Sequence, residues 1–209
     1  MRVLTTETTL AVCRPADSGA TPIIATTGQA MSRRRLLAGL PVAGAVFLAF
    51  GGSRALAAEG SAAGDRFDFL SANGNSNCST AFMESIATMP ADARLQGSCC
   101  SPMDRQRYLK QVEGLTKYKA VAEIPSDPYD IVAGLAQKLM AQYDATLTPA
   151  QQPIYQFAMD NSAEQGPCCC QCWRWQVYGG LAKLLIHEHQ FTGKQIVEVW
   201  NLSDGCGGA

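Results

Sequence analysis

After residue 78 the chain alternates short polar turns with stretches in which apolar side chains recur at helical spacing. Ser79 is a good N-cap, and Pro90 ends the stretch that follows it. Phe82, Ile86 and Met89 in that stretch are spaced for one face of a helix. The pattern therefore predicts a helix that begins directly after Ser79.

Three further turns carry helix-start residues. Residues 101–104 ("SPMD") combine a hydroxyl cap, a proline at the first helical position and a carboxylate in the first turn. Residues 127–130 ("DPYD") have a similar order, and residues 148–151 ("TPAQ") form a capping box. Each turn predicts a helix. The side chains expected to face inward in the last two of these helices are Ile131, Leu135, Leu139, Ile154 and Phe157.

The longest apolar periodicity covers residues 173–187. Residues 192–195 ("TGKQ") then form a second capping box before a last short helix. No stretch alternates apolar and polar residues as a half-buried strand does, and the sequence has no repeat of fixed period. The sequence therefore predicts an all-α fold, a compact irregular domain of about five or six helices with cysteine-rich loops at helix N-termini.

The N-terminal part has the order of an export signal. From Met31 it contains arginines at 33–35, an apolar run over 36–50 and the small residues of an A-x-A cleavage signal that ends at Ala57. The apolar run is shorter than the ~20 residues that a membrane-spanning helix needs. The order Ser-Arg-Arg-Arg-Leu-Leu resembles a twin-arginine signal, and an ordinary secretory signal with a basic start is the alternative.

This interpretation divides the chain into three parts. Residues 1–57 are an N-terminal extension and signal peptide, with Met31 as an alternative start. Residues 58–77 are a polar, flexible lead-in, and residues 78–209 are the cysteine-rich helical domain. We expect the mature protein in the periplasm or outside the cell. Its partners would include the twin-arginine export machinery, and it would have no membrane anchor after cleavage.

Charge and motifs narrow the function classes. After residue 57 the acidic residues outnumber the basic ones, and the basic residues form no run. Nucleic-acid binders carry a basic face or stripe, so nucleic acid is not an expected partner. The sequence has no G-x-S-x-G elbow, phosphate-binding loop or H-E-x-x-H pair. It therefore predicts no catalytic residues and does not indicate an enzyme.

The number and the positions of the cysteines are the features of this sequence that most need an explanation. A domain of this size does not need disulfides to fold. The cysteines stand directly before three of the expected helices, where the backbone N–H groups and the helix dipole favour a negatively charged thiolate. The C-terminal "SDGCGGA" is expected to be a flexible tail whose glycines let its cysteine reach back. The eight cysteines after residue 57 are Cys78, Cys99, Cys100, Cys168, Cys169, Cys170, Cys172 and Cys206.

Disulfides are one explanation for the cysteines of an exported chain. Sequence neighbours are only ~3.8 Å apart at Cα, closer than the ~4.4–6.8 Å usual for a disulfide. A complete framework therefore needs every cysteine of the 168–170 triplet to find a distant partner. Cys78 and Cys206 are the main candidates for partial pairing. On this interpretation the protein is a disulfide-stabilised, non-catalytic interaction domain.

A metal site is the second explanation. Residues 166–175 ("GPCCCQCWRW") place Cys168, Cys170 and Cys172 at alternate positions of one loop, where three thiolates can face a common centre. Soft thiolates select Cu(I), Zn(II) and iron–sulfur clusters. Arg174 either offsets the negative charge of such a cluster or is solvated. The further ligands expected are Cys99, Cys100 and Cys169, while Cys78 and Cys206 are either additional ligands or disulfide partners.

The hexapeptide Pro167-Cys168-Cys169-Cys170-Gln171-Cys172 resembles the P-C-Y-C-G-C signature of an uncharacterised family of exported, cysteine-rich bacterial proteins. It shares the proline and three cysteines at the same spacing. It differs at Cys169 and Gln171, where the family has tyrosine and glycine. The resemblance implies an exported protein of unassigned activity, with Cys168, Cys170 and Cys172 as the residues of interest.

These observations together predict an exported protein that sequesters or transfers a soft metal ion. Cu(I) and Zn(II) are the expected ions, and an iron–sulfur redox centre is a variant of the same idea.

Overall fold

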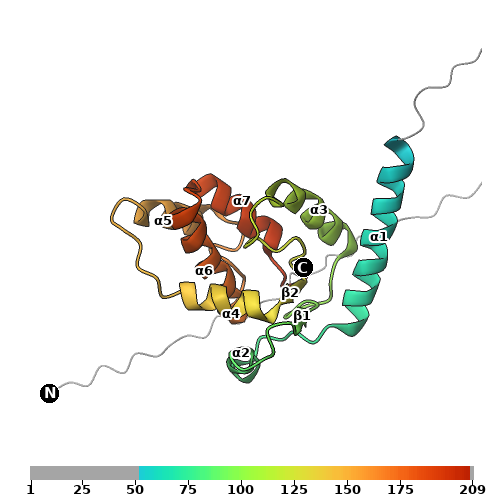
Figure 1. Ribbon diagram of the computed structural model, residues 1–209, viewed down its shortest axis with the longest axis horizontal. Helices are drawn as coiled ribbons and strands as arrows, with labels where there is room; N and C mark the ends of the chain where they lie inside the picture. The colour runs from blue at the N-terminus through green and yellow to red at the C-terminus, as the bar shows by residue number, and fades with distance from the viewer. Residues whose placement is uncertain (1–51, 208–209) are drawn as a thin grey trace, which may run out of the picture.

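Helices dominate the computed structural model, which describes residues 52–207 (Figure 1). The prediction of a compact, mostly helical fold is confirmed for these residues, which add one small two-stranded sheet. In chain order the elements are α1 (Gly52–Asn73), α2 (Thr80–Ile86), β1 (Arg94–Gln96), α3 (Arg105–Leu115), the 3-10 helix η1 (Thr116–Tyr118), β2 (Asp130–Val132), α4 (Ala133–Gln142), α5 (Gln152–Asn161), α6 (Trp173–Glu188) and α7 (Gly193–Ser203).

The central helix of the core is α6, with α4, α5 and α7 around it (Figure 1). Its buried side chains lie on all sides, as expected of a helix that is packed all round. α4 approaches so closely that a Cβ at Gly180 would lie 1.8 Å from the carbonyl oxygen of Leu139. On another side, Trp200 of α7 donates a 2.9 Å hydrogen bond to the carbonyl of Tyr178. The longest apolar stretch of the sequence is therefore the helix around which the others pack.

Two predicted helix starts are confirmed in detail. Ser79 caps α2 by accepting a hydrogen bond of 3.1 Å from the Phe82 N–H. Thr192 and Gln195 form the expected capping box of α7, each side chain bonding to the backbone of the other. Such caps satisfy N–H groups that the first turn of a helix leaves without a partner.

Residues 101–104 differ from the expectation, because α3 begins only at Arg105. Asp104 is the N-cap and accepts a hydrogen bond of 2.7 Å from the Arg107 N–H. Ser101 instead donates its hydroxyl to the carbonyl of Cys206, 3.0 Å away. The capping carboxylate lies three residues later than the expected hydroxyl, so Cys99 and Cys100 do not stand at a helix N-terminus.

Residues 127–130 do not open a helix, which corrects a second expectation. They lead into β2, which pairs antiparallel with β1 so that Ile131 lies opposite Leu95. Asp130 is buried and forms ion pairs with Arg66 and Arg94. These pairs join β2 to segments far away in the sequence, which local helix-start rules do not take into account.

The expected flexible lead-in is largely helical, since α1 continues to Asn73 and includes the expected cleavage position. Phe67 and Leu70 pack with Tyr108 of α3 and with Tyr129 in a small second core. The rings of Phe67 and Tyr108 have centres 5.7 Å apart. Two apolar residues three positions apart form only a narrow helix face, which explains why the pattern was not distinctive in the sequence.

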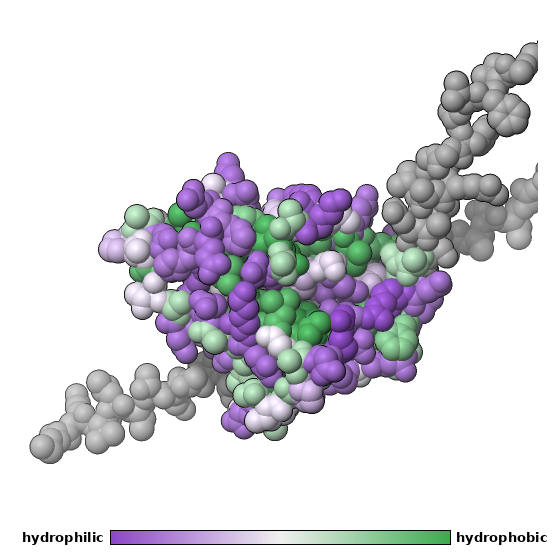
Figure 2. All heavy atoms as spheres, viewed as in Figure 1, coloured by the Kyte–Doolittle hydropathy of each residue, from purple (hydrophilic) through white to green (hydrophobic). Residues whose placement is uncertain are grey.

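The surface of the protein is mainly hydrophilic, as in most globular proteins. Figure 2 shows hydrophilic residues over most of one face, with a smaller hydrophobic area near its centre. Phe157 of α5, expected to face inward, is 38% exposed.

Across residues 52–207, no helix has both the length and the apolar character that crossing a membrane requires. The arginine-rich segment and the apolar run of the expected signal lie outside the described residues.

Candidate metal centre

All eight cysteines of the described chain come together in one cluster, which we call the thiol cluster. Cys78 Sγ lies 3.0 Å from Cys100 Sγ and 3.4 Å from Cys170 Sγ. Cys206 Sγ lies 2.8 Å from Cys168 Sγ and 3.8 Å from Cys99 Sγ. No disulfide joins them in the structure. Four segments that are distant in sequence therefore supply one continuous set of sulfur atoms.

The loop before α6 is held by its own turn. Gly166 has a φ of +154° and donates its N–H to Ser162 Oγ over 2.8 Å. A Cβ at Gly166 would lie 2.5 Å from the ring of Trp175, so only glycine fits against that side chain. The turn directs the following cysteines toward the core, and Cys172 becomes the N-cap residue of α6.

The segment at 97–101 is fixed from the opposite side. Gly97 has a φ of +76°, which glycine adopts without strain, and donates its N–H to the carbonyl of Tyr129 over 2.8 Å. Its own carbonyl accepts a hydrogen bond of 2.8 Å from Arg174 Nη2. These contacts place Cys99 and Cys100 beside the loop that precedes α6, although neither stands at a helix start.

The C-terminal segment is bound to the cluster, whereas the sequence predicted a flexible tail that reaches back. Cys206 accepts two hydrogen bonds of 3.0 Å at its carbonyl, from the N–H and the hydroxyl of Ser101. Its own N–H donates to Asp204 Oδ1 over 3.1 Å. Gly207 has a φ of +102°, and a Cβ there would lie 2.3 Å from the Ser101 carbonyl oxygen. Cys206 is therefore a fixed member of the cluster.

The thiol cluster extends from the core to the surface. Cys168, Cys172 and Cys206 are buried, at 1%, 4% and 5% exposure. Cys100 is exposed, and Cys78 and Cys170 are half-buried. An ion bound deep in the cluster would be shielded from water, while the Cys100 edge remains open for exchange.

Three overlapping groups of four cysteines have sulfur atoms that all lie within 4.8 Å of one another and could hold a metal ion. A tetrahedral ion with metal–sulfur bonds of ~2.3 Å holds its sulfurs ~3.8 Å apart. The Sγ–Sγ contacts of 2.8–3.8 Å in the cluster reach that spacing at their upper end. The groups are Cys78, Cys99, Cys170 and Cys172; Cys99, Cys100, Cys170 and Cys206; and Cys168, Cys169, Cys170 and Cys206.

Arg174 is fully buried beside the thiol cluster and is not solvated. It donates hydrogen bonds to the carbonyls of Pro128 and Gly97, while its Nε has no hydrogen-bond partner in the described part of the chain. Its guanidinium lies 4.5 Å from the centre of the Trp173 ring. Within residues 52–207 it forms no ion pair with a carboxylate, so its counter-charge must come from another kind of group.

Cys99, whose pKa is lowered, is the main source of that counter-charge. Burial alone would lower the pKa of Arg174, but the charge of neighbouring groups, Cys99 first and then Tyr178, Cys168 and Cys206, outweighs burial and raises it. A buried cation requires a nearby anion because isolated charges are costly to desolvate. Of the two roles that the sequence left open for Arg174, the structure therefore supports charge compensation of the cysteines over a solvated side chain.

Hydrogen bonds among the thiols divide their protons unevenly. The pKa of Cys99 is lowered, chiefly by its hydrogen bond with Cys100 and against the effect of burial. The pKa of Cys78 is raised, chiefly by its hydrogen bonds with Cys100 and Cys170. The lowered pKa favours the thiolate at Cys99, and thiolate is the form that binds metals.

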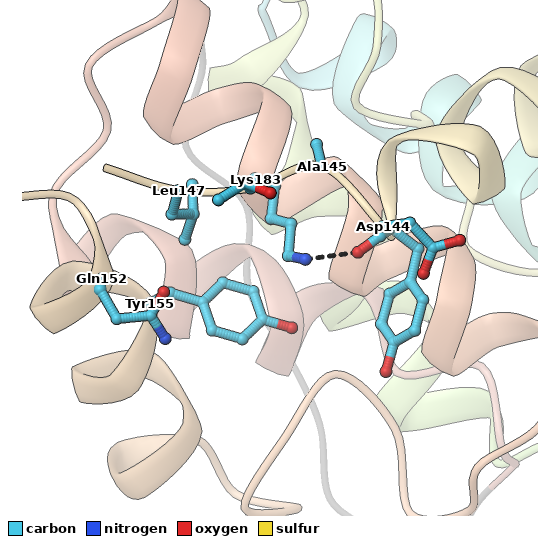
Figure 3. A pocket seen from close by; sticks show the side chains of 8 residues that line it. Asp144, Ala145, Leu147, Gln152, Tyr155 and Lys183 are labelled. Carbon is cyan, nitrogen blue, oxygen red and sulfur yellow. Dashed lines mark hydrogen bonds between the residues drawn. The ribbon is translucent and has the colours of Figure 1, made fainter. Parts of the chain in front are cut away.

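A separate hollow of about 420 Å³ lies between α6 and the segment that joins α4 to α5 (Figure 3). Lys183 donates to the carbonyl of Tyr143, and its Nζ lies 5.4 Å and 5.9 Å from the ring centres of Tyr143 and Tyr155. The residues that line the hollow include no cysteine and no histidine. Its lysine is already bonded, and we assign no chemistry to this hollow.

The structure brings together every cysteine that the sequence singled out. The loop cysteines, Cys99 and Cys100 lie in one cluster with Cys78 and Cys206, whose roles the sequence left open between ligand and disulfide. The burial of Arg174 had no signal in the sequence beyond its position next to the cysteines.

No family model, curated protein or solved structure matches the chain.

Proposed function

We propose that this protein is an exported soft-metal-binding protein that sequesters or transfers Cu(I) or Zn(II). The observation that carries the proposal is the convergence of eight thiols from four segments beside a buried arginine that, within residues 52–207, has no carboxylate partner. Thiolates are the preferred protein ligands of these two ions. The export signal expected around Arg33 and Arg34 supports a role outside the cytoplasm.

The sulfur distances favour ions that share ligands directly over a [4Fe–4S] centre. In a [4Fe–4S] cluster each cysteine binds a separate iron atom, and sulfide ions lie between the iron atoms. Cysteine sulfurs around a cluster of that type are therefore farther apart than sulfurs that bind one ion. Here Cys170 Sγ is only 3.4 Å from both Cys78 Sγ and Cys100 Sγ.

The second candidate is a disulfide-stabilised, non-catalytic interaction domain. Two close contacts favour it, since Cys168–Cys206 and Cys78–Cys100 are the sulfur pairs at 2.8 Å and 3.0 Å. Oxidation would join these pairs with little movement of the backbone. This function requires no ion and predicts paired cysteines in the isolated protein.

Metal content and thiol count separate the two functions. The protein is purified without chelator and without added reductant or oxidant, and its metal is measured by elemental mass spectrometry. Thiols are then titrated in denaturant with chelator. Metal binding predicts bound copper or zinc and eight reactive thiols in the part after residue 57. Paired cysteines and no metal would exclude the metal function.

Thermal unfolding provides a second measure of the same proposal. A metal that binds only the folded state adds RT ln(1 + [L]/Kd), about 2.7 kcal/mol at a free concentration of 100 times Kd. The melting temperature of the reduced protein should therefore rise when Zn(II) or Cu(I) is added. Mg(II), which prefers oxygen ligands, is the control and should leave it unchanged.

A further inference from the structure

The three four-thiol groups of the cluster are not independent of one another. Cys170 belongs to all three, and Cys99 and Cys206 each belong to two. Together the groups use all eight cysteines. Three tetrahedral ions need twelve ligands, and eight thiolates supply them only when some sulfur atoms bind more than one ion.

A single ion would use only half of the cysteines in the cluster as ligands. Four thiolates complete a tetrahedral site, so one ion would leave four other cysteines of the cluster unbound. Whichever of the three groups held the ion, the four cysteines outside that group would include at least one of the buried thiols Cys168, Cys172 and Cys206. A set of ions that share ligands uses all of them.

Cys170 has the position that a shared ligand needs. Its Sγ lies 3.4 Å from both Cys78 Sγ and Cys100 Sγ, and it is half-buried between the exposed and the buried ends of the cluster. Arg174 is buried beside two of the segments that supply the sulfurs: it bonds to the carbonyl of Gly97 and lies against the backbone of Gly205. A cation is therefore held next to the segments that carry Cys99 and Cys206, which each belong to two of the groups.

The geometry points to a polynuclear centre in which two or three thiophilic ions share thiolates, with Cys170 as the bridging ligand. This inference rests on the proposed metal-binding function and adds the number of ions and their linkage. Each thiol that binds gives its proton to solvent as its sulfur–metal bond forms, so loading changes no oxidation state. Cu(I) and Zn(II) have this chemistry in common, and separate titrations distinguish them.

Stoichiometry is the first test. The reduced, metal-free protein is titrated with Zn(II) and, separately and anaerobically, with Cu(I), and the ions per chain are counted by native mass spectrometry. We expect two or three Zn(II) ions, and at least as many Cu(I) ions because Cu(I) also accepts two or three ligands. Replacement of Zn(II) by ¹¹³Cd(II) should give resonances that are split by coupling through a bridging sulfur.

Two serine variants on the same loop form a matched pair. Cys172→Ser removes a ligand that belongs to one group, whereas Cys170→Ser removes the ligand common to all three. We expect Cys172→Ser to lose about one Zn(II) ion and Cys170→Ser to lose at least two, with the ¹¹³Cd coupling reduced or absent. Far-UV circular dichroism checks that both variants fold.

Each outcome has a distinct meaning. One Zn(II) ion per chain, with four thiols still reactive, would overturn the polynuclear inference and leave the proposed function intact. No bound ion would overturn both. Two or three ions without ¹¹³Cd coupling would show separate sites and would also overturn the inference. If Cys170→Ser does not fold, the stoichiometry and coupling of the unmodified protein decide the question.

Discussion

Arg174 is the residue that links the thiol cluster to the core. It is buried beneath the cluster, lies against Trp173, and bonds to two backbone carbonyls. Gly205 leaves room for it, because a Cβ there would lie 2.2 Å from Arg174 Nη1. The guanidinium thus has a fixed position, and its charge is available to thiolates without the cost of ordering a mobile side chain.

Arg174→Met is therefore expected to weaken metal binding. Methionine keeps much of the volume but removes the charge that favours thiolate over thiol. We expect the affinity for Zn(II) to fall at least tenfold, which corresponds to about 1.4 kcal/mol. Competition with a chromophoric chelator at constant pH measures the change.

Arg174→Lys is the matched control, because it keeps the charge and loses only the forked hydrogen bonds. It should bind Zn(II) more tightly than Arg174→Met. An Arg174→Met protein that folds and binds Zn(II) with unchanged affinity would show that the arginine only fills space.

At the scale of the elements, the position of the cluster depends on how closely α4 packs on α6. Gly180 is the contact point, where the backbone of α4 occupies the space of a Cβ. The loop with the most cysteines leads directly into α6. A shift of α6 would therefore move Cys172 and its neighbours relative to the other segments.

Gly180→Ala should destabilise the protein by about 3 kcal/mol or more, because the added methyl meets backbone atoms that cannot rotate away. Gly64→Ala in α1 is the control, since a Cβ there meets only the far end of the Arg105 side chain. That change should be neutral or stabilise the helix by up to ~1 kcal/mol. Urea unfolding of both variants measures the difference, and equal stabilities would refute the proposed contact.

Local signals in the sequence predicted a helix correctly where no contact with distant residues competes with them. The caps at Ser79 and Thr192 and the apolar stretch before His187 correspond to observed helices. The helix expected at "DPYD" does form, but it begins only at Ala133, because Asp130 pairs with arginines far away in sequence and lies in a strand. Neighbours in space, which the sequence does not reveal, decided that case.

The same distinction applies to the site. Clustering in the sequence identified the 168–172 loop, and the residue types identified thiol chemistry. The sequence did not show that Cys78 and Cys206 enter the same cluster, since that depends on how α2 and the C-terminal segment pack. It also left the environment of Arg174 open, because burial of a charged side chain runs against the usual tendency of its residue type.

At the scale of the whole molecule, the cluster joins segments that no helix contains and that a few hydrogen bonds hold in place. Cys78, the 97–101 segment and the residues after α7 all lie outside the helices. Cysteines of these segments, including Cys206, pack against a core around α6 whose large apolar side chains, among them Trp173 and Trp200, come mainly from the helices. Metal removal should therefore loosen the segments without unfolding the core.

Hydrogen–deuterium exchange followed by mass spectrometry tests this expectation. Removal of Zn(II) from the loaded protein should increase exchange in residues 76–79, 97–101, 164–172 and 204–207. Peptides from α4 and α6 should change little, because their protection reflects the packing of the core. Loss of protection throughout the molecule would mean that metal and fold form one cooperative unit.

The distribution of the thiols along the chain has a consequence for how the protein is assembled. Four cysteines lie within residues 168–172, so an unfolded chain already offers a local trap for an ion, whereas Cys78 and Cys206 must come from far away. An ion captured early would stabilise unfolded molecules and compete with correct ligation. Such a layout favours an order in which the helices fold first and the ions arrive afterwards, at a site whose more distant ligands are already in place.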